Sequence, residues 1–328
     1  MWFLCPDRFT PEIRDAIKSF NGSWLPRHGS ECDFILYHYT EPKGITGILR
    51  NRAMWLTHTS ALNDPSELNY GKEVISNELD EARDLEKNSI IRNLLYLLSK
   101  NLNRFDTILY EVYITCFCLD PNLVSQWRCY SNQGCGYNIG LKFDSNTKLY
   151  HTISKSDSHS HLVLRRVVYE PNEQQSLVRD YMKRVVQAVN KAKDKFRSQE
   201  EIDNWLPMAA QEASNVLFDL ILSFKNQAFE EEEECRLIMA MRADHRPEQL
   251  RFRERNGALV PYLQMHIVDE TADGLTFPLH SVTFGPKLNT ETTKRTLNLL
   301  LRSEAASGHK VRISGNTVKV NDPGYVTG

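Results

Sequence analysis

The sequence predicts a single α+β domain over residues 1–328, with helical insertions at about 71–104 and 172–228. Two observations lead to this prediction. Strand-like and helix-like segments are mixed along the chain without the strict βαβ alternation of a doubly wound sheet, which favours a mixed or antiparallel sheet with flanking helices. The 328 residues can bury a sizeable core, and no repeat, heptad, low-complexity tract or linker divides them.

Short strands and helices are expected in the first half of the chain. The stretch "FILYHYT" (34–40) has the two-residue period of a strand and places His38 on the face of Phe34 and Leu36. Pro42 suits the first position of a helix, and an apolar i, i+3, i+4 stripe follows it. Further strands are predicted over 53–58, 106–119, 136–143 and 162–169, with a short helix around 123–131.

The stretch "LNDPSE" (62–67) indicates the start of another helix. Asp64 as N-cap, Pro65 at the first helical position and Glu67 at the third form a capping box, which explains these residues without a ligand. Asn63 has no part in that explanation.

The second half begins with a long helical pattern and continues with strands. Pro207 is expected to divide the helical segment at 172–228 into two helices near "NWLPM". Strands are predicted over 235–241, 259–268, 277–285 and 310–314, and a helix over about 290–305.

Composition and charge argue against several classes of function. The formal net charge is −2, so no global field attracts nucleic acid or an anionic membrane. The N-terminal stretch lacks the basic lead and apolar core of a signal peptide, and no run of eighteen apolar residues occurs. We therefore expect a cytoplasmic protein without a membrane partner.

The cysteines and the common sequence motifs point to neither a metal site nor a familiar enzyme class. An odd number of cysteines, seven, fits reduced thiols, and the spacing of Cys116, Cys118, Cys129 and Cys135 lacks the paired C-x2–4-C pattern of structural zinc. No phosphate loop, nucleophile elbow, zinc-protease or kinase motif occurs. The stretch "GCGYNIG" places its third glycine one position late for a dinucleotide fingerprint.

A run of glutamates precedes the strand-like segment "CRLIMAM". If the strand extends back by a few residues, Glu232, Glu234 and Arg236 share one face by its two-residue period. Gathering such charges is costly unless they have a purpose. The alternative is a surface strand that carries a salt-bridge ladder.

Two aromatic residues lie three positions apart in the short helix around 123–131. Trp127 and Tyr130 would share one helical face. This face either packs on the sheet or forms an aromatic wall that stacks a flat ligand ring.

In their order and spacing, these motifs resemble a large uncharacterised bacterial family with the pattern YHYT, LNDPxE, W…Y, ExExR and GP. The residues that carry the resemblance are Tyr37-His38-Tyr39-Thr40, Leu62-Asn63-Asp64-Pro65 with Glu67, Trp127 with Tyr130, Glu232 to Arg236, and Gly285-Pro286. The opening at 37–57 resembles, more distantly, the start of DNA-targeting ADP-ribosyltransferase toxins, which have a Y-H-I-T strand, a short helix and a second strand.

The distant resemblance implies a split, mixed or antiparallel sheet that binds NAD without a Rossmann fingerprint, and it implies roles for individual residues. His38 would bind a ribose hydroxyl of NAD, and Glu234 or Glu232 would contact the nicotinamide ribose. The stacking aromatic would be Tyr130 or Trp127. Further contacts with the dinucleotide are expected from Tyr39, Thr40, Asn63 and Arg236, the last on the pyrophosphate or the acceptor.

The expected function is therefore that of an NAD-consuming ADP-ribosyltransferase or NAD glycohydrolase, with NAD as substrate. Such an enzyme would act as a toxin or phage-defence effector on a nucleic acid or protein acceptor, with an antitoxin or other protein as partner. Two alternatives stay open: a non-catalytic module that binds a nucleotide or partner on the same fold, and a nuclease whose Glu232, Glu234 and His38 hold a divalent metal.

Overall fold

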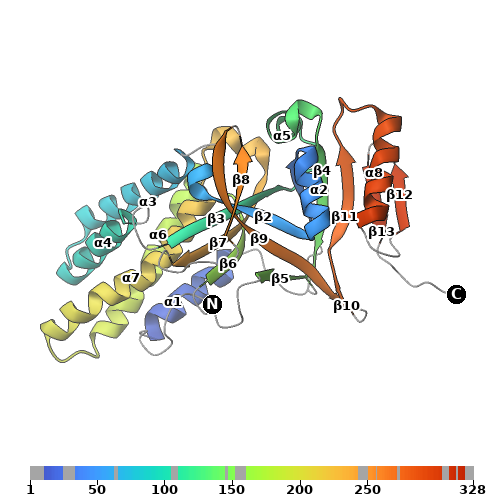
Figure 1. The fold of residues 1–328 in the computed structure, drawn as a ribbon. Helices are drawn as coiled ribbons and strands as arrows, with labels where there is room; N and C mark the ends of the chain where they lie inside the picture. The colour runs from blue at the N-terminus through green and yellow to red at the C-terminus, as the bar shows by residue number, and fades with distance from the viewer. Residues whose placement is uncertain are drawn as a thin grey trace.

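The protein is built around an antiparallel β-sheet with helices on both of its faces (Figure 1). The computed structural model describes residues 11–24, 34–62, 66–104, 110–144, 147–151, 160–242, 250–255, 257–271, 274–304, 310–314 and 317–321. The central strands are β1 (Phe34–Thr40), β2 (Ala53–His58), β3 (Tyr110–Cys118), β4 (Tyr137–Phe143), β7 (Glu234–Arg242), β9 (Ala258–Thr271) and β11 (Leu279–Phe284). The remaining strands are β5 (Thr147–His151), β6 (Ser160–Arg166), β8 (Arg251–Arg255), β10 (Gly274–Thr276), β12 (Lys310–Ser314) and β13 (Thr317–Asn321).

The strand order along the main path is β10-β9-β2-β3-β1-β4-β11-β13-β12. Strand β7 pairs with β3 and β6, while β5 and β8 pair with β9. Every ladder between these strands is antiparallel.

The sheet splits along one edge of β3. Strand β7 occupies the other edge over the full length of β3. Strand β2 pairs with Tyr113 and Ile114, whereas β1 pairs only with Cys118 at the far end of β3. Among the described strands, residues 115–117 therefore have no ladder partner on this edge, and the sheet opens between β1 and β2.

Most of the helical mass covers one face of the sheet and lies at the left of Figure 1. It consists of α1 (Pro11–Trp24), α3 (Ser66–Leu85), α4 (Ser89–Leu102), α6 (Pro171–Lys193) and α7 (Gln199–Ser223). These helices enclose a large apolar core that includes Ile114 of β3 and Ile238 of β7. Helix α7 is buried all round from Glu212 to Ser223, as expected of a helix at the centre of a core.

The other face packs on α2 (Pro42–Asn51) and α8 (Thr290–Glu304). Helix α2 follows β1 directly and buries Ile45, Ile48 and Leu49, the apolar stripe seen in the sequence. The short helix α5 (Val124–Tyr130) forms a third, small cluster in which Trp127 packs with Tyr39 and Cys118.

The predicted α+β class is confirmed, as are the strands β1, β2, β4, β7, β9, β11 and β12 within a few residues. Pro207 does not divide the helical segment, because α7 runs through it and the break lies at 194–198 instead. Pro207 is exposed, so water can satisfy the carbonyl that has lost its partner. The capping residues Asp64 and Pro65 lie outside the described residues.

Two further expectations concern the start of β7 and helices that could span a membrane. Strand β7 does not extend back to Glu232, because Glu233 adopts a left-handed conformation (φ 44°) that ends the preceding 3-10 helix η4 (Gln227–Glu232). In the part of the chain that the structure describes, no helix is long and apolar enough to cross a membrane.

Candidate functional site

His38 lies at the opening between β1 and β2. Its Nδ1 donates a hydrogen bond of 2.8 Å to the carbonyl oxygen of Cys116, within the unpaired stretch of β3. Burial lowers the pKa of His38, so the neutral ring is favoured at pH 7. Because Nδ1 carries the proton, the Nε2 lone pair remains as an acceptor, and Nε2 makes no hydrogen bond to any described residue.

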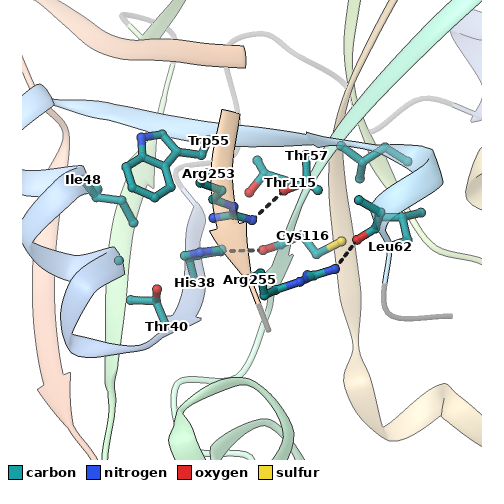
Figure 2. Close-up of a pocket in the computed structure, with 13 residues that line it drawn as sticks. His38, Thr40, Ile48, Trp55, Thr57, Leu62, Thr115, Cys116, Arg253 and Arg255 are labelled. Carbon is teal, nitrogen blue, oxygen red and sulfur yellow. Dashed lines mark hydrogen bonds between the residues drawn. The ribbon is translucent and has the colours of Figure 1, made fainter. Parts of the chain in front are cut away.

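His38 borders two hollows. The first, which we call the carboxylate hollow, is a cavity of about 60 Å³ lined by Tyr37, His38, Tyr39, Cys116, Phe117, Gln126, Tyr130, Glu232 and Glu234. The second, which we call the arginine hollow, is a cavity of about 140 Å³ lined by His38, Thr40, Gly44, Ile48, Trp55, Thr57, Ala61, Leu62, Ile114, Thr115, Cys116, Arg253 and Arg255 (Figure 2). The structure thus brings His38, Tyr39, Tyr130, Glu232 and Glu234 together in the carboxylate hollow and places Thr40 in the arginine hollow.

Beside the carboxylate hollow, a network of buried charges joins α3, the segment between α7 and β7, and the start of β7. The Lys225 ammonium lies 2.9 Å from Glu67, 2.6 Å from Glu232 and 3.3 Å from Glu234. Arg236 donates to Glu234 through Nε (3.0 Å) and Nη2 (2.9 Å), and to Glu67 through Nη2 (2.6 Å). Three carboxylates face two cations, so the network has a formal charge of −1 when all five groups are ionised.

The two candidate glutamates have different environments. Glu234 is 6% exposed, and although burial favours its neutral form, Arg236 and Lys225 outweigh burial and hold its pKa at about 2. The Glu232 side chain is 15% exposed, and burial raises its pKa even though Lys225 acts in the opposite direction. Glu232 is therefore the more readily protonated of the two glutamates and has the better access to a ligand.

Of the predicted stacking aromatics, only Tyr130 reaches the carboxylate hollow, where its hydroxyl lies 3.5 Å from Glu232 Oε1. Trp127 is buried and packs edge-on against Tyr39, with ring centroids 4.9 Å apart. Its indole nitrogen donates to Asn122. Of the two alternatives for this helical face, packing on the sheet therefore holds for Trp127, and Tyr130 is left as the candidate stacking ring.

The remaining predicted residues are placed as follows. Arg236 is 2% exposed, and its three nitrogens all donate to protein acceptors, including the Leu222 carbonyl, so its position argues against a contact with pyrophosphate. Tyr39 is also buried, and its hydroxyl donates to the Asp120 carbonyl. Asn63 lies outside the described residues.

Sequence reasoning missed four charged residues of the site: Glu67, Lys225, Arg253 and Arg255. Glu67 had an adequate explanation in the capping box, but its carboxylate pairs with Lys225 and Arg236. The other three belong to no motif, and only the fold brings them to the site.

A comparison with protein-family models gives a match that covers part of this site. Residues 126–237 match the model of a family described as "Protein of unknown function (DUF2971)". The matched range holds Trp127, Tyr130, Glu232, Glu234 and Arg236. No curated protein and no solved structure matches the chain, so the relation to ADP-ribosyltransferases stays a prediction.

Proposed function

We propose that the protein cleaves the nicotinamide–ribose bond of NAD, as an ADP-ribosyltransferase or NAD glycohydrolase. One observation supports this proposal above the others. His38 and two glutamates, nearly two hundred residues apart in the chain, line a single hollow together with Tyr130. This set contains the histidine, aromatic and glutamate that the resemblance to ADP-ribosyltransferases implies.

In the reaction, the bond between C1′ of the ribose and the nicotinamide nitrogen breaks, and its electron pair leaves with neutral nicotinamide. The ribose then carries oxocarbenium-like charge until water or an acceptor nucleophile bonds to C1′ and loses its proton. A carboxylate close to the ribose stabilises this transient charge. We assign that role to Glu232, because both oxygens of Glu234 accept from Arg236 and the Glu232 side chain is the more exposed of the two.

His38 would position the substrate. Its Nε2 lone pair can accept a hydrogen bond from a ribose hydroxyl, since Nδ1–H is held by the Cys116 carbonyl. A fixed tautomer and a ring held within a sheet keep this acceptor in place before the substrate binds.

The proposal is tested by incubating the purified protein with NAD, alone and with DNA, RNA or protein acceptors, and measuring free nicotinamide and label transfer. We expect turnover by the wild type and a loss of about 100-fold or more in Glu232→Gln, as found when one electrostatic group is removed from a transition state. The control is Glu231→Gln, an exposed neighbour in the same helix η4, which should retain activity. No nicotinamide release under any of these conditions would refute the catalytic proposal.

A second candidate is a non-catalytic module that binds a nucleotide at the same place. It is favoured by the ion pairs of Glu234, which resemble a structural network more than a reactive group. Binding of NAD in calorimetry without nicotinamide release over hours would support this candidate. A metal-dependent nuclease is less favoured, because Lys225 and Arg236 already compensate the carboxylates that would hold the metal.

A further inference from the structure

The arginine hollow is lined by two cationic side chains from one strand. Arg253 and Arg255 lie two residues apart on β8 and both line the hollow, while Glu254 between them is exposed and accepts from the Gly257 amide. Strand periodicity thus turns two guanidinium groups inward and the intervening carboxylate outward.

Arg253 is held in one orientation by neutral partners. Its Nη2 donates to the Thr57 hydroxyl at 2.9 Å, and its guanidinium lies 5.4 Å from the ring centroid of Trp55 and 5.8 Å from that of Tyr262. The Nε of Arg253 is buried and has no hydrogen-bond partner. Within the described ranges, no carboxylate forms an ion pair with this residue.

A buried guanidinium nitrogen without an acceptor is unfavourable unless a bound anion accepts its hydrogen bond. A buried donor without a partner costs about 1–3 kcal/mol, and more when the group is charged. A phosphoryl group carries several acceptor oxygens and pairs well with the planar fork of donors on an arginine. Figure 2 shows Arg253, Thr115 and His38 around one space, so a bound anion would lie next to the ring that faces the carboxylate hollow.

We propose that the arginine hollow binds a phosphoryl anion, the diphosphate of a nucleotide, through Arg253 and Arg255. The cavity of about 140 Å³ suits such a group but not a whole nucleotide, whose remaining parts would extend past His38 or toward solvent. For the identity of the nucleotide, this inference rests on the proposed function. It also supplies the phosphate contact for which Arg236 is too deeply buried.

The proposal is tested by calorimetric titration of the full chain with inorganic pyrophosphate and with ADP at constant ionic strength. We expect both probes to bind the wild type, and Arg253→Met to lose about 10- to 100-fold in affinity, as expected for hydrogen bonds to a charged group. The matched control is Arg251→Met, on the exposed part of the same strand, with unchanged affinity. Failure of the wild type to bind either probe, or equal affinities of the two variants, would overturn the proposal.

Two more measurements keep the outcomes distinct. If Arg253→Met does not fold, as judged by circular dichroism, Arg255→Met is titrated instead, and an affinity equal to that of the wild type counts against the site. Binding through Arg253 without nicotinamide release supports this inference while the proposed catalysis fails. Turnover of NAD by Arg253→Met with an unchanged KM overturns this inference alone.

Discussion

At the scale of single residues, the site contains two kinds of carboxylate that look equivalent in the sequence. Glu234 is buried, and both of its oxygens accept from Arg236. Glu232 lies two residues earlier, at the end of a 3-10 helix, and remains partly accessible. Their difference comes from the left-handed turn at Glu233, which removes Glu232 from the strand and leaves Glu234 at its first position.

The buried network should make stability depend on Glu234. Replacing it by Gln removes the charged partner that accepts from both Nε and Nη2 of the buried Arg236, so we expect Glu234→Gln to lower the free energy of unfolding at pH 7 by about 3–5 kcal/mol. Urea denaturation measures this loss, and the exposed control Glu231→Gln should change it by less than about 0.5 kcal/mol.

The lowered pKa of Glu234 also predicts how the free energy of unfolding falls at acid pH. Because Glu234 has a folded-state pKa of about 2, below its ordinary value of 4.5, its contribution is fully present above about pH 5. This contribution is lost as the pH falls from that value toward 2. Glu234→Gln should therefore show a shallower loss of stability over this range, and an acid limb as steep as that of the wild type would contradict the assignment.

The sequence could identify a site residue where the residue lies within a recognisable local motif. His38 was identified from a strand pattern and the motif around it, and the strand indeed places it beside a hollow. Lys225 and Arg253 could not be identified, because each acquires its role from partners far away in the chain, Glu67 and Thr57 respectively.

At the scale of elements, the predicted strands are those with apolar residues on at least one face. Strand β8, "RFRER", has no such pattern: among the described strands it pairs with β9 alone, and it is largely exposed. It nevertheless supplies both arginines of the arginine hollow. The sheet's split at β3 was implied by resemblance alone, since strand pairing depends on contacts that no local pattern encodes.

The crossing of α3 and α7 allows a test of packing between elements. Gly71 of α3 approaches α7 so closely that an added Cβ would lie 2.6 Å from the Ile221 carbonyl oxygen and 3.0 Å from its Cα. Alanine favours helix over glycine by about 1 kcal/mol, but a clash with backbone cannot be relieved by a rotamer change. We expect Gly71→Ala to lower the free energy of unfolding by about 1–3 kcal/mol.

Thermal and urea denaturation would measure this change. The control is Asn77→Ala, at an exposed position of the same helix, which should leave stability unchanged or slightly raise it. If Gly71→Ala were the more stable of the two variants, the close approach of α3 and α7 would be refuted.

At the scale of the whole molecule, two apolar cores lie on opposite faces of one sheet. Ile114 and Ile238 belong to the core under the helices, whereas Tyr113 and Leu237 belong to the core on the side of α2 and α8. Since these residues alternate along β3 and β7, the same pair of strands has one face in each core. The ladder between β3 and β7 also positions the site: Glu234 and Arg236 lie on β7, and His38 donates to the Cys116 carbonyl of β3.

The shared ladder predicts that the two cores unfold together, as a single domain would. Trp205 reports on the helical core, and Trp55 lies on the opposite side, against Tyr262. The chain has five tryptophans, so two variants are made that each keep one of them, Trp55 or Trp205, with the other four replaced by Phe. In both, urea unfolding followed by fluorescence should coincide with unfolding followed by far-UV circular dichroism. Strands β3 and β7 contribute side chains to both cores, so unfolding of one core takes these strands away from the other core as well. Two separated transitions, or fluorescence that leads circular dichroism in one variant only, would show instead that the helical insertions form a unit of their own.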